Sequence, residues 1–220
     1  GDREQTPYIA GRRTGTSENI YDLTEEEAFS EFIQKKHPGD LEISEPWYRW
    51  NCYVSLEQIR QNVENWAKAR VQHSQDGILI KDGEDYVLRE VDGIGEIQNA
   101  EIITRNTGGA VHELLLAGSE GVLKVKYEYN IRLMLGIPGG EVYKNDGSIG
   151  EGGNLLPSGY FVMEPVEEEG RLAGYQICGG GLGHGAGMSQ VGARILAEEG
   201  YGYDEILQYF YHEIRLARLE

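Results

Sequence analysis

Cysteine is scarce in this sequence of 220 residues: Cys52 and Cys178 are the only two, and they stand 126 positions apart. They form no CxxC pair, so their spacing indicates neither a zinc site nor a redox motif. We expect two ordinary thiols and leave a disulfide between them as the open alternative. Two cysteines are too few to decide the redox compartment.

Basic residues are also few. The chain has 20 Lys and Arg against 37 Asp and Glu, which gives a formal net charge of −17. Nucleic-acid binding needs a concentrated positive surface, and no run of Lys or Arg is present. The composition therefore predicts that nucleic acid is not a partner, and it disfavours anionic membrane surfaces for the same reason.

Long apolar runs are missing as well. No stretch approaches the roughly 18 consecutive apolar residues of a membrane-spanning helix, and the first residues lack the pattern of a signal peptide. Residues 1–19 are polar and turn-rich, like a domain that begins partway through. We therefore expect any export signal or membrane anchor to lie in a segment absent from this chain.

Glycine, in contrast, is abundant. The 31 glycines accompany only 6 prolines and follow no collagen-like period, which indicates many turns and close backbone approaches. With 40% hydrophobic residues the chain can bury a substantial core. We expect one N-terminally incomplete domain over residues 1–220, with a helical, aromatic-rich subregion at 20–75 and a strand-rich core at 76–220.

Two capping boxes predict helices in the first third of the chain. Thr24 with Glu27 predicts a helix over residues 24–36, and Ser55 with Gln58 precedes apolar residues at three- and four-residue steps. Between them lies the segment Trp47-Tyr48-Arg49-Trp50. It either stacks on sugar rings or forms a packed linker with the cation over an aromatic face, and the packed linker is the simpler interpretation.

From residue 77 onward, short apolar runs broken by turn residues predict antiparallel strands. Residues 106–109 are typical of a hairpin turn, and 129–135 of a short helix. The fold class we predict is α+β, with mainly antiparallel strands, several peripheral helices and a glycine-rich loop that leads into a C-terminal helix pair. The predicted strands are 77–81, 85–91, 100–106, 111–116, 122–127, 161–165 and 174–178.

The glycine-rich loop is the most informative motif. Six of the nine residues from Gly179 to Gly187 are glycine, and His184 stands among them. The loop runs into a predicted helix start, where free backbone N–H groups suit an anionic or hydroxyl-rich ligand. It lacks the GxGxxG spacing and the P-loop lysine, which disfavours a nucleotide. His184 either faces that ligand or is a structural histidine bonded to backbone, and the small neighbours favour exposure.

The block GGGLGHGAGMSQVGA at Gly179–Ala193 resembles the signature of the stage II sporulation protein D and amidase-enhancer domain family. The similarity extends over roughly residues 40–212. The further matching segments are Glu45–Trp50, Asn130–Gly136, Leu155–Phe161 and Ala197–Tyr211.

The resemblance implies a lytic transglycosylase-like protein that cleaves peptide-stripped glycan strands of peptidoglycan in sporulation or wall remodelling. It implies no cofactor and no metal, an extracytoplasmic location, and partners among glycan strands and other cell-wall hydrolases of the sporulation machinery. The residues it places at the substrate are Gly183, His184, Gly185, Gly187, Ser189 and Gln190.

The chain departs from the family at the catalytic acid. The family glutamate belongs to a Glu-Met-Pro block before an alanine-rich helix, and neither occurs here. The acid/base role therefore cannot be assigned, and Glu113, Glu151 and Glu164 are weak substitutes in so acidic a chain. Two interpretations stay open: a fragment of the enzyme that carries the substrate cleft, which we favour, or a non-catalytic glycan-binding or amidase-activating module.

Two other site types have little support in the sequence. A Cys178/His184 thiol hydrolase needs a third orienting group, and a metal site from these two residues with His112 lacks ligand spacing. Because glycan strands carry lactyl carboxylates, we also expect a local cationic lining, for which Arg105, Arg132 and Arg194 are candidates.

Overall fold

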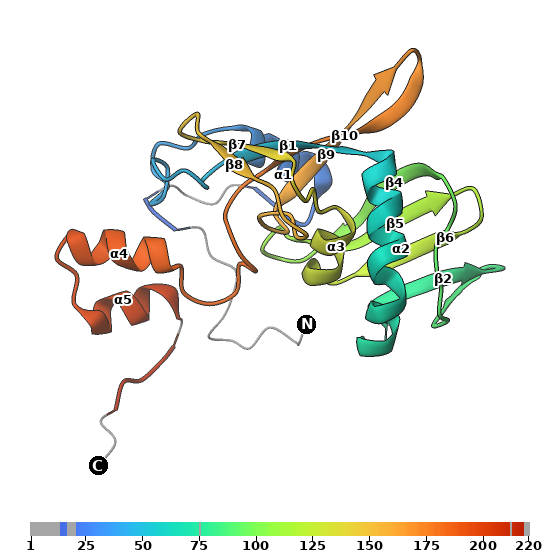
Figure 1. The fold of residues 1–220 in the computed structure, drawn as a ribbon. Helices are drawn as coiled ribbons and strands as arrows, with labels where there is room; N and C mark the ends of the chain where they lie inside the picture. Colours follow the sequence, from blue (N-terminus) through green and yellow to red (C-terminus); the bar gives the residue numbers. More distant parts are fainter. Residues whose placement is uncertain (1–13, 17–20, 75, 212, 218–220) are drawn as a thin grey trace.

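The computed structural model describes residues 14–16, 21–74, 76–211 and 213–217. The polar opening segment of the sequence lies largely outside these residues. The described part holds two antiparallel sheets with helices around them (Figure 1), which confirms the predicted α+β class.

The first sheet has the strand order β8-β7-β1-β10-β9, and the second has the order β3-β2-β6-β5-β4. Each pairing between neighbouring strands is antiparallel. The first sheet consists of β1 (Trp50–Ser55), β7 (Glu141–Lys144), β8 (Ile149–Glu151), β9 (Phe161–Glu168) and β10 (Arg171–Gly179). The second consists of β2 (Ile78–Asp82), β3 (Asp85–Val87), β4 (Ile97–Arg105), β5 (Val111–Gly118) and β6 (Val122–Lys126).

Within the described residues, five helices accompany the sheets: α1 (Glu26–Gln34), α2 (Leu56–His73), α3 (Glu128–Met134), α4 (Gln190–Glu198) and α5 (Tyr203–Phe210). The last two form the predicted C-terminal helix pair, which lies beside the sheets in Figure 1. Leu41 joins the small apolar cluster between these two helices, so the pair is packed against the segment before β1.

The main core lies between the two sheets and α2. Ile59 and Val63 from α2 share one buried cluster with Trp50 of β1 and Leu114 of β5. The buried amide of Asn62 donates hydrogen bonds to the carbonyls of Met134 and Gly136, at 3.0 and 2.8 Å. These bonds satisfy carbonyl groups at the end of α3 and fix that helix against α2.

The two predicted capping boxes have different outcomes. The Ser55 hydroxyl accepts from the Gln58 amide at 3.1 Å and caps α2, as predicted. The Thr24 capping box is wrong, because the Thr24 hydroxyl donates to Asp22 at 2.6 Å and α1 starts later, at Glu26, without a side-chain cap. The short side chain of Asp22 offers a local turn that competes with the helix start.

The aromatic segment before β1 is a packed linker, as its simpler interpretation predicted. The Arg49 guanidinium lies 4.0 Å from the centroid of the Tyr48 ring and 5.2 Å from that of Phe32. Trp50 is buried and begins β1, a central strand that the sequence pattern did not indicate.

A buried guanidinium connects the two sheets to α1. Arg105, at the end of β4, donates to both carboxylate oxygens of Glu26 at 2.6 and 2.8 Å. It also donates to the carbonyls of Gly109 and Phe161 at 3.0 and 2.9 Å, and it lies 3.8 Å from the centroid of the Phe29 ring. Burial lowers the pKa of the guanidinium, while Glu26 acts in the opposite sense and keeps the charge compensated.

Removing this buried cation should destabilise the whole domain. We expect Arg105→Met to lower the free energy of unfolding by about 3 kcal/mol, because three sets of acceptors lose their donor. Arg171→Met, at an exposed position of the β9–β10 hairpin, should change it by less than about 0.5 kcal/mol. Urea denaturation of both variants checks this, and equal losses would contradict the role of Arg105.

Candidate functional site

The glycine-rich loop begins where β10 leaves the first sheet. The amide of Gly181 donates to the carbonyl of Trp47 at 2.7 Å, and the Trp50 indole donates to the carbonyl of Gly181 at 3.0 Å. A Cβ at Gly179 would lie 2.3 Å from the Trp50 ring. Gly179 is therefore needed because its backbone lies directly on the Trp50 ring.

Along the next part of the loop, the backbone angle φ is positive at every second residue. Gly181, Gly183, Gly185 and Gly187 all have positive φ, with values of +79°, +114°, +67° and +83°. This left-handed region costs other residues steric strain, so every second position requires glycine. The intervening side chains of Leu182, His184, Ala186 and Met188 are all exposed, and Leu182 reaches 63%.

The short segment before β9, residues 157–160, packs against the loop and hydrogen-bonds to its backbone. A Cβ at Gly185 would lie 2.3 Å from the Tyr160 ring, and the Tyr160 hydroxyl donates to the Gly185 carbonyl at 3.3 Å. The Gly183 amide donates to the carbonyl of Pro157 at 2.8 Å, and the Ser158 hydroxyl donates to the carbonyl of Gly180 at 2.6 Å. The loop is thus held through its backbone groups, while its side chains stay exposed.

Arg132 fixes this supporting segment. Its guanidinium donates to the carbonyls of Leu156 and Pro157 at 2.8 and 3.2 Å, and to the Glu128 carboxylate at 3.0 Å. Burial raises the pKa of the Tyr160 phenol, and the Glu128 carboxylate raises it further. Tyr160 therefore stays protonated and remains a hydrogen-bond donor to the loop.

The sequence analysis missed Glu128 and Tyr160. The four-residue spacing of Glu128 and Arg132 on one helix was the available signal for the ion pair. Nothing local in the sequence indicated that the pair would lie under the glycine-rich loop, because that contact joins residues far apart in the chain.

The predicted site residues divide into two kinds. His184 is exposed, and its Nδ1 accepts a hydrogen bond from the Ala186 amide at 3.0 Å. A neutral imidazole in this arrangement carries its proton on Nε2, which then acts as a donor. No partner for Nε2 is found among the residues that the structure describes. The bond to Ala186 is the backbone contact of the structural interpretation, while a ligand-facing role of the exposed His184 stays a prediction.

Ser189 and Gln190 lie where the loop enters α4. The Ser189 hydroxyl accepts from the Gly192 amide at 3.1 Å and caps this helix, so it has a structural task. Gln190 is the first helical residue, and its side chain is exposed. Gly183, Gly185 and Gly187, all with positive φ, shape the backbone on both sides of His184.

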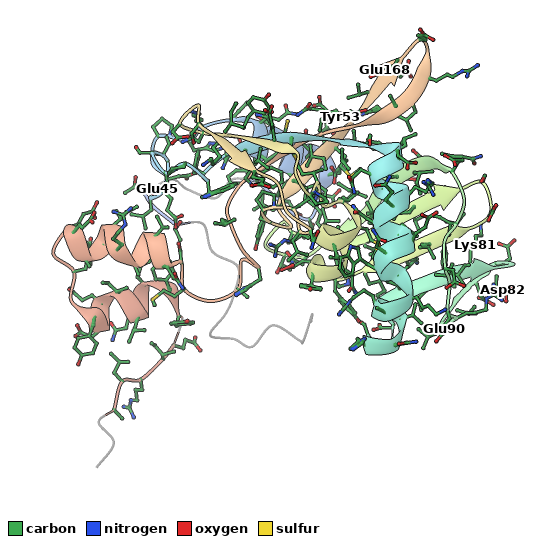
Figure 2. The ribbon with its side chains drawn as sticks, viewed as in Figure 1. Glu45, Tyr53, Lys81, Asp82, Glu90 and Glu168 are labelled. Carbon is green, nitrogen blue, oxygen red and sulfur yellow. The ribbon has the colours of Figure 1, made fainter. Side chains whose placement is uncertain are left out.

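The predicted cationic lining needs correction. Arg105 and Arg132 are buried and paired with carboxylates, so the interpretation of these two as sugar-contacting cations is wrong. Arg194 is half exposed, but it is bonded to Glu45 at 2.6 Å and to Glu198 at 2.9 Å. Figure 2 shows Glu45 on the side of the sheets that faces α4.

The three substitute carboxylates lie on separate strands. Glu113 is on β5, Glu151 is on the edge strand β8, and Glu164 on β9 accepts from the Gln34 amide at 3.0 Å. None of the contacts that hold the glycine-rich loop within the described residues involves them. Glu128 is the carboxylate beside Tyr160, and it is engaged by Arg132.

Both cysteines are free thiols, so the disulfide alternative is not realised. Burial raises the pKa of the Cys52 thiol to about 12. Cys178 packs against the cluster formed by Phe29, Ile33 and Val162, and burial raises the pKa of its thiol too. A nucleophilic thiol needs the opposite shift, so neither cysteine is suited to covalent catalysis.

The described residues offer neither a metal site nor a membrane-spanning helix. They contain no group of three or more His, Cys, Asp or Glu side chains placed to hold a metal ion. Their helices are also too short or too polar for any of them to cross a membrane.

The fold and loop define an α+β domain of two antiparallel sheets that presents a glycine-rich loop on an aromatic support. Residues 2–187 match the family described as a domain of unknown function, DUF8618, and the chain belongs to this family. The matched range includes the glycine-rich loop up to Gly187 and stops before α4.

The chain is also similar to a protein of Bacillus subtilis (strain 168) named "Amidase enhancer". The two are 25% identical over 179 residues, which cover 81% of this chain and 22% of that protein. The chain thus spans about a fifth of the length of this curated relative. The similarity supports a relation to the amidase-enhancer group, while membership of the stage II sporulation protein D family stays a prediction.

The support under the loop can be tested with two alanine substitutions. Gly181 and Gly185 have similar φ, but a Cβ at Gly181 meets no atom within 4 Å. We expect Gly181→Ala to cost only backbone strain of about 1 kcal/mol, and Gly185→Ala to cost at least about 1 kcal/mol more because its Cβ meets the Tyr160 ring. Chemical denaturation measures both, and equal costs would show that Tyr160 does not support the loop.

Proposed function

We propose that this chain is a glycan-contacting module of a bacterial cell-wall protein, and that its glycine-rich loop binds the sugar strand. One observation carries the proposal: a loop fixed through its backbone presents His184, with Nε2 as a donor, between the exposed apolar side chains of Leu182 and Met188. Sugar hydroxyls and acetamide carbonyls accept hydrogen bonds, and the C–H faces of hexoses pack on apolar surface.

Two similarities to other proteins support this proposal. The relative's printed name, "Amidase enhancer", points to cell-wall metabolism. The motif at residues 179–193 resembles that of proteins that act on peptidoglycan glycan. We therefore propose a location outside the cytoplasmic membrane, where peptidoglycan lies, with glycan strands and wall hydrolases as partners and an anchor in a segment absent from this chain.

Cleavage of the glycan is the finer proposal, and it belongs to the protein as a whole. Lytic transglycosylase chemistry needs a carboxylic acid that protonates the glycosidic oxygen. Beside the loop, the described residues offer Glu128, which is engaged by Arg132. We therefore assign sugar binding to this chain and assign the acid to another part of the protein.

Enhancement of an amidase is the second candidate function, and the relative's name favours it. In that case the loop would hold a glycan strand so that an amidase reaches the attached peptides. Both candidates share the same first step, which is binding of glycan by the loop.

Glycan binding is tested by co-sedimentation with peptide-free glycan strands. We expect His184→Ala to weaken binding roughly fivefold, since it removes one hydrogen bond worth about 1 kcal/mol. His73→Ala is the matched control, because His73 is also exposed and also bonds to backbone through Nδ1. The loop would be excluded as the binding site if both variants bound like the wild type.

The two candidate activities are separated with the full-length protein. Lytic transglycosylase activity on peptide-free glycan should release anhydro-sugar ends, which mass spectrometry detects. Enhancement should instead accelerate peptide release from intact peptidoglycan by a wall amidase, without anhydro ends. Binding with neither result would leave this protein as a glycan-binding module.

A further inference from the structure

One face of the first sheet is only partly covered. On β1, Trp50, Cys52 and Val54 point into the core, while Asn51 and Tyr53 point to the other side and are exposed. The strand register identifies the residues that share this second face, since side chains alternate along each strand. Val162 and Cys178 belong to this face but pack against Phe29 and Ile33 of α1. The part beside α1 consists of Asn51, Tyr53, Glu141, Tyr143, Ile149, Glu151, Glu164 and Gln176, which we call the acidic–aromatic face.

Large exposed side chains lie in the middle of this face. Tyr53, Tyr143 and Ile149 are 41%, 44% and 55% exposed. Tyr143 is paired with Asn51 on one side and with Ile149 on the other, and Tyr53 lies two residues beyond Asn51 on β1. Tyr53, Tyr143 and Ile149 therefore form an oblique row across three strands. Several large exposed apolar groups on one surface are typical of a contact site.

Carboxylates surround the row. At the hairpin end of the face, Arg171 lies opposite Glu168, so these two charges offset each other. Glu141 and Glu151 are paired across β7 and β8, and Glu164 lies opposite Gln176 at the other edge. The Tyr143 hydroxyl donates to Glu141 at 2.6 Å. Glu168 lies on the projecting β9–β10 hairpin, which Figure 2 shows beyond Tyr53. Burial raises the pKa of the Tyr53 phenol, and the charge of Glu168 raises it further.

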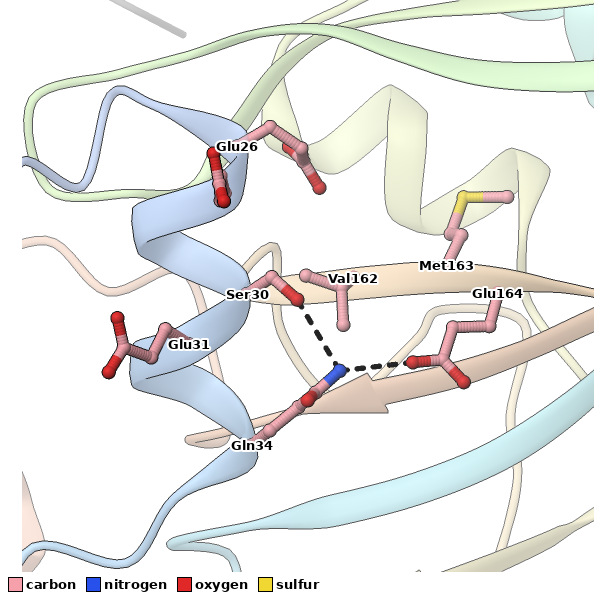
Figure 3. Close-up of a pocket in the computed structure, with 8 residues that line it drawn as sticks. Glu26, Ser30, Glu31, Gln34, Val162, Met163 and Glu164 are labelled. Atoms are coloured by element: carbon pink, nitrogen blue, oxygen red, sulfur yellow. Dashed lines mark hydrogen bonds between the residues drawn. The ribbon is translucent and has the colours of Figure 1, made fainter.

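A groove continues the face beyond Glu164. It has a volume of about 670 Å³ and lies between α1 and β9. Figure 3 shows Gln34 reaching from α1 to Glu164 across this groove. Glu26 and Glu31 in its wall are paired with Arg105 and Lys35, so Glu164 and Glu27 contribute most to its negative charge.

The chemistry of this surface selects a cation-bearing partner. Lysine and arginine pack their alkyl stems on tyrosine rings, place their charges over the ring face and pair with carboxylates beside it. Peptidoglycan glycan is anionic, so this face repels it. The uncovered tyrosines and the unbalanced carboxylates are both satisfied by the same ligand, a basic polypeptide.

We infer that the acidic–aromatic face is a docking surface for a lysine- and arginine-rich segment of a partner protein. The interaction goes beyond the proposed glycan contact, because it uses neither the glycine-rich loop nor His184. Charge complementarity gives the partner its chemistry, and the row of Tyr53, Tyr143 and Ile149 gives the contact its apolar centre.

The test measures binding of a dye-labelled peptide of alternating lysine and serine by fluorescence anisotropy at physiological ionic strength. The face variant carries Glu141→Gln, Glu151→Gln and Glu164→Gln. The matched control carries Glu84→Gln, Asp85→Asn and Glu101→Gln, which are exposed on the second sheet and remove the same charge. Each exposed contact is worth about a factor of two, so the face variant should bind roughly eightfold more weakly.

The control should weaken binding by less than about twofold, because general attraction is screened at this ionic strength. Equal weakening in both variants would overturn the inference, since the peptide would then follow net charge alone. Unchanged binding in the face variant would overturn it as well. Unfolding midpoints of both variants exclude misfolding as the cause.

A second pair of variants tests the aromatic contribution. Tyr143→Ala should weaken peptide binding by about threefold, and Tyr203→Ala, which removes a 77% exposed tyrosine on α5, should not. Equal effects would contradict the proposed row. Glycan co-sedimentation of the same variants keeps the two proposals separate: the face variants should bind glycan like the wild type whichever way the peptide result falls.

Discussion

The guanidinium of Arg105 is buried where α1, the β4–β5 turn and the start of β9 meet. A buried charge is tolerated only when its donors are matched, so Glu26, Gly109 and Phe161 must all be in place at once. This requirement fixes the position of α1 over one part of the first sheet. It also fixes Phe161, which directly follows the segment that supports the glycine-rich loop.

The loop depends on that support because glycine has little conformational preference of its own. Ordering so many glycines costs conformational entropy, and the bonds to Trp47, Pro157 and Tyr160 offset part of this cost. The second buried guanidinium, Arg132, holds the carbonyls of Leu156 and Pro157 in turn. Two cations that sequence reasoning assigned to ligand binding thus serve the framework, and the exposed His184 remains as the polar group of the loop.

The sequence predicted most of the helices and strands and missed β1, β7 and β8. The strands that became β4, β5 and β6 have enough alternating apolar residues to be recognised, and α2 has both periodicity and a capping serine. β7 and β8 have only four and three residues, too few for any period to show. β1 was missed because its alternation is brief, lies between an aromatic linker and a helix, and depends on pairing with β10, which is distant in the chain.

The candidate site shows the same division between local and distant information. The density of glycine predicted a loop with close approaches, and four positive φ values account for it. The partners under the loop, Tyr160 and Glu128, come from other parts of the chain, and no local signal places them beside it. The loop could therefore be located from the sequence, whereas the roles of Arg105 and Arg132 could not. The residues around an arginine do not tell whether it binds a ligand or backbone carbonyls.

The net charge of −17 gives the two proposed surfaces opposite electrostatic conditions. An anionic glycan approaches the loop against the general field of the protein, so its binding must come from hydrogen bonds and apolar contact. A basic segment approaches the acidic–aromatic face with that field. Salt screens both effects, so it favours the first interaction and weakens the second. Under the two proposals, an anionic polymer and a cationic protein would therefore not compete for one surface.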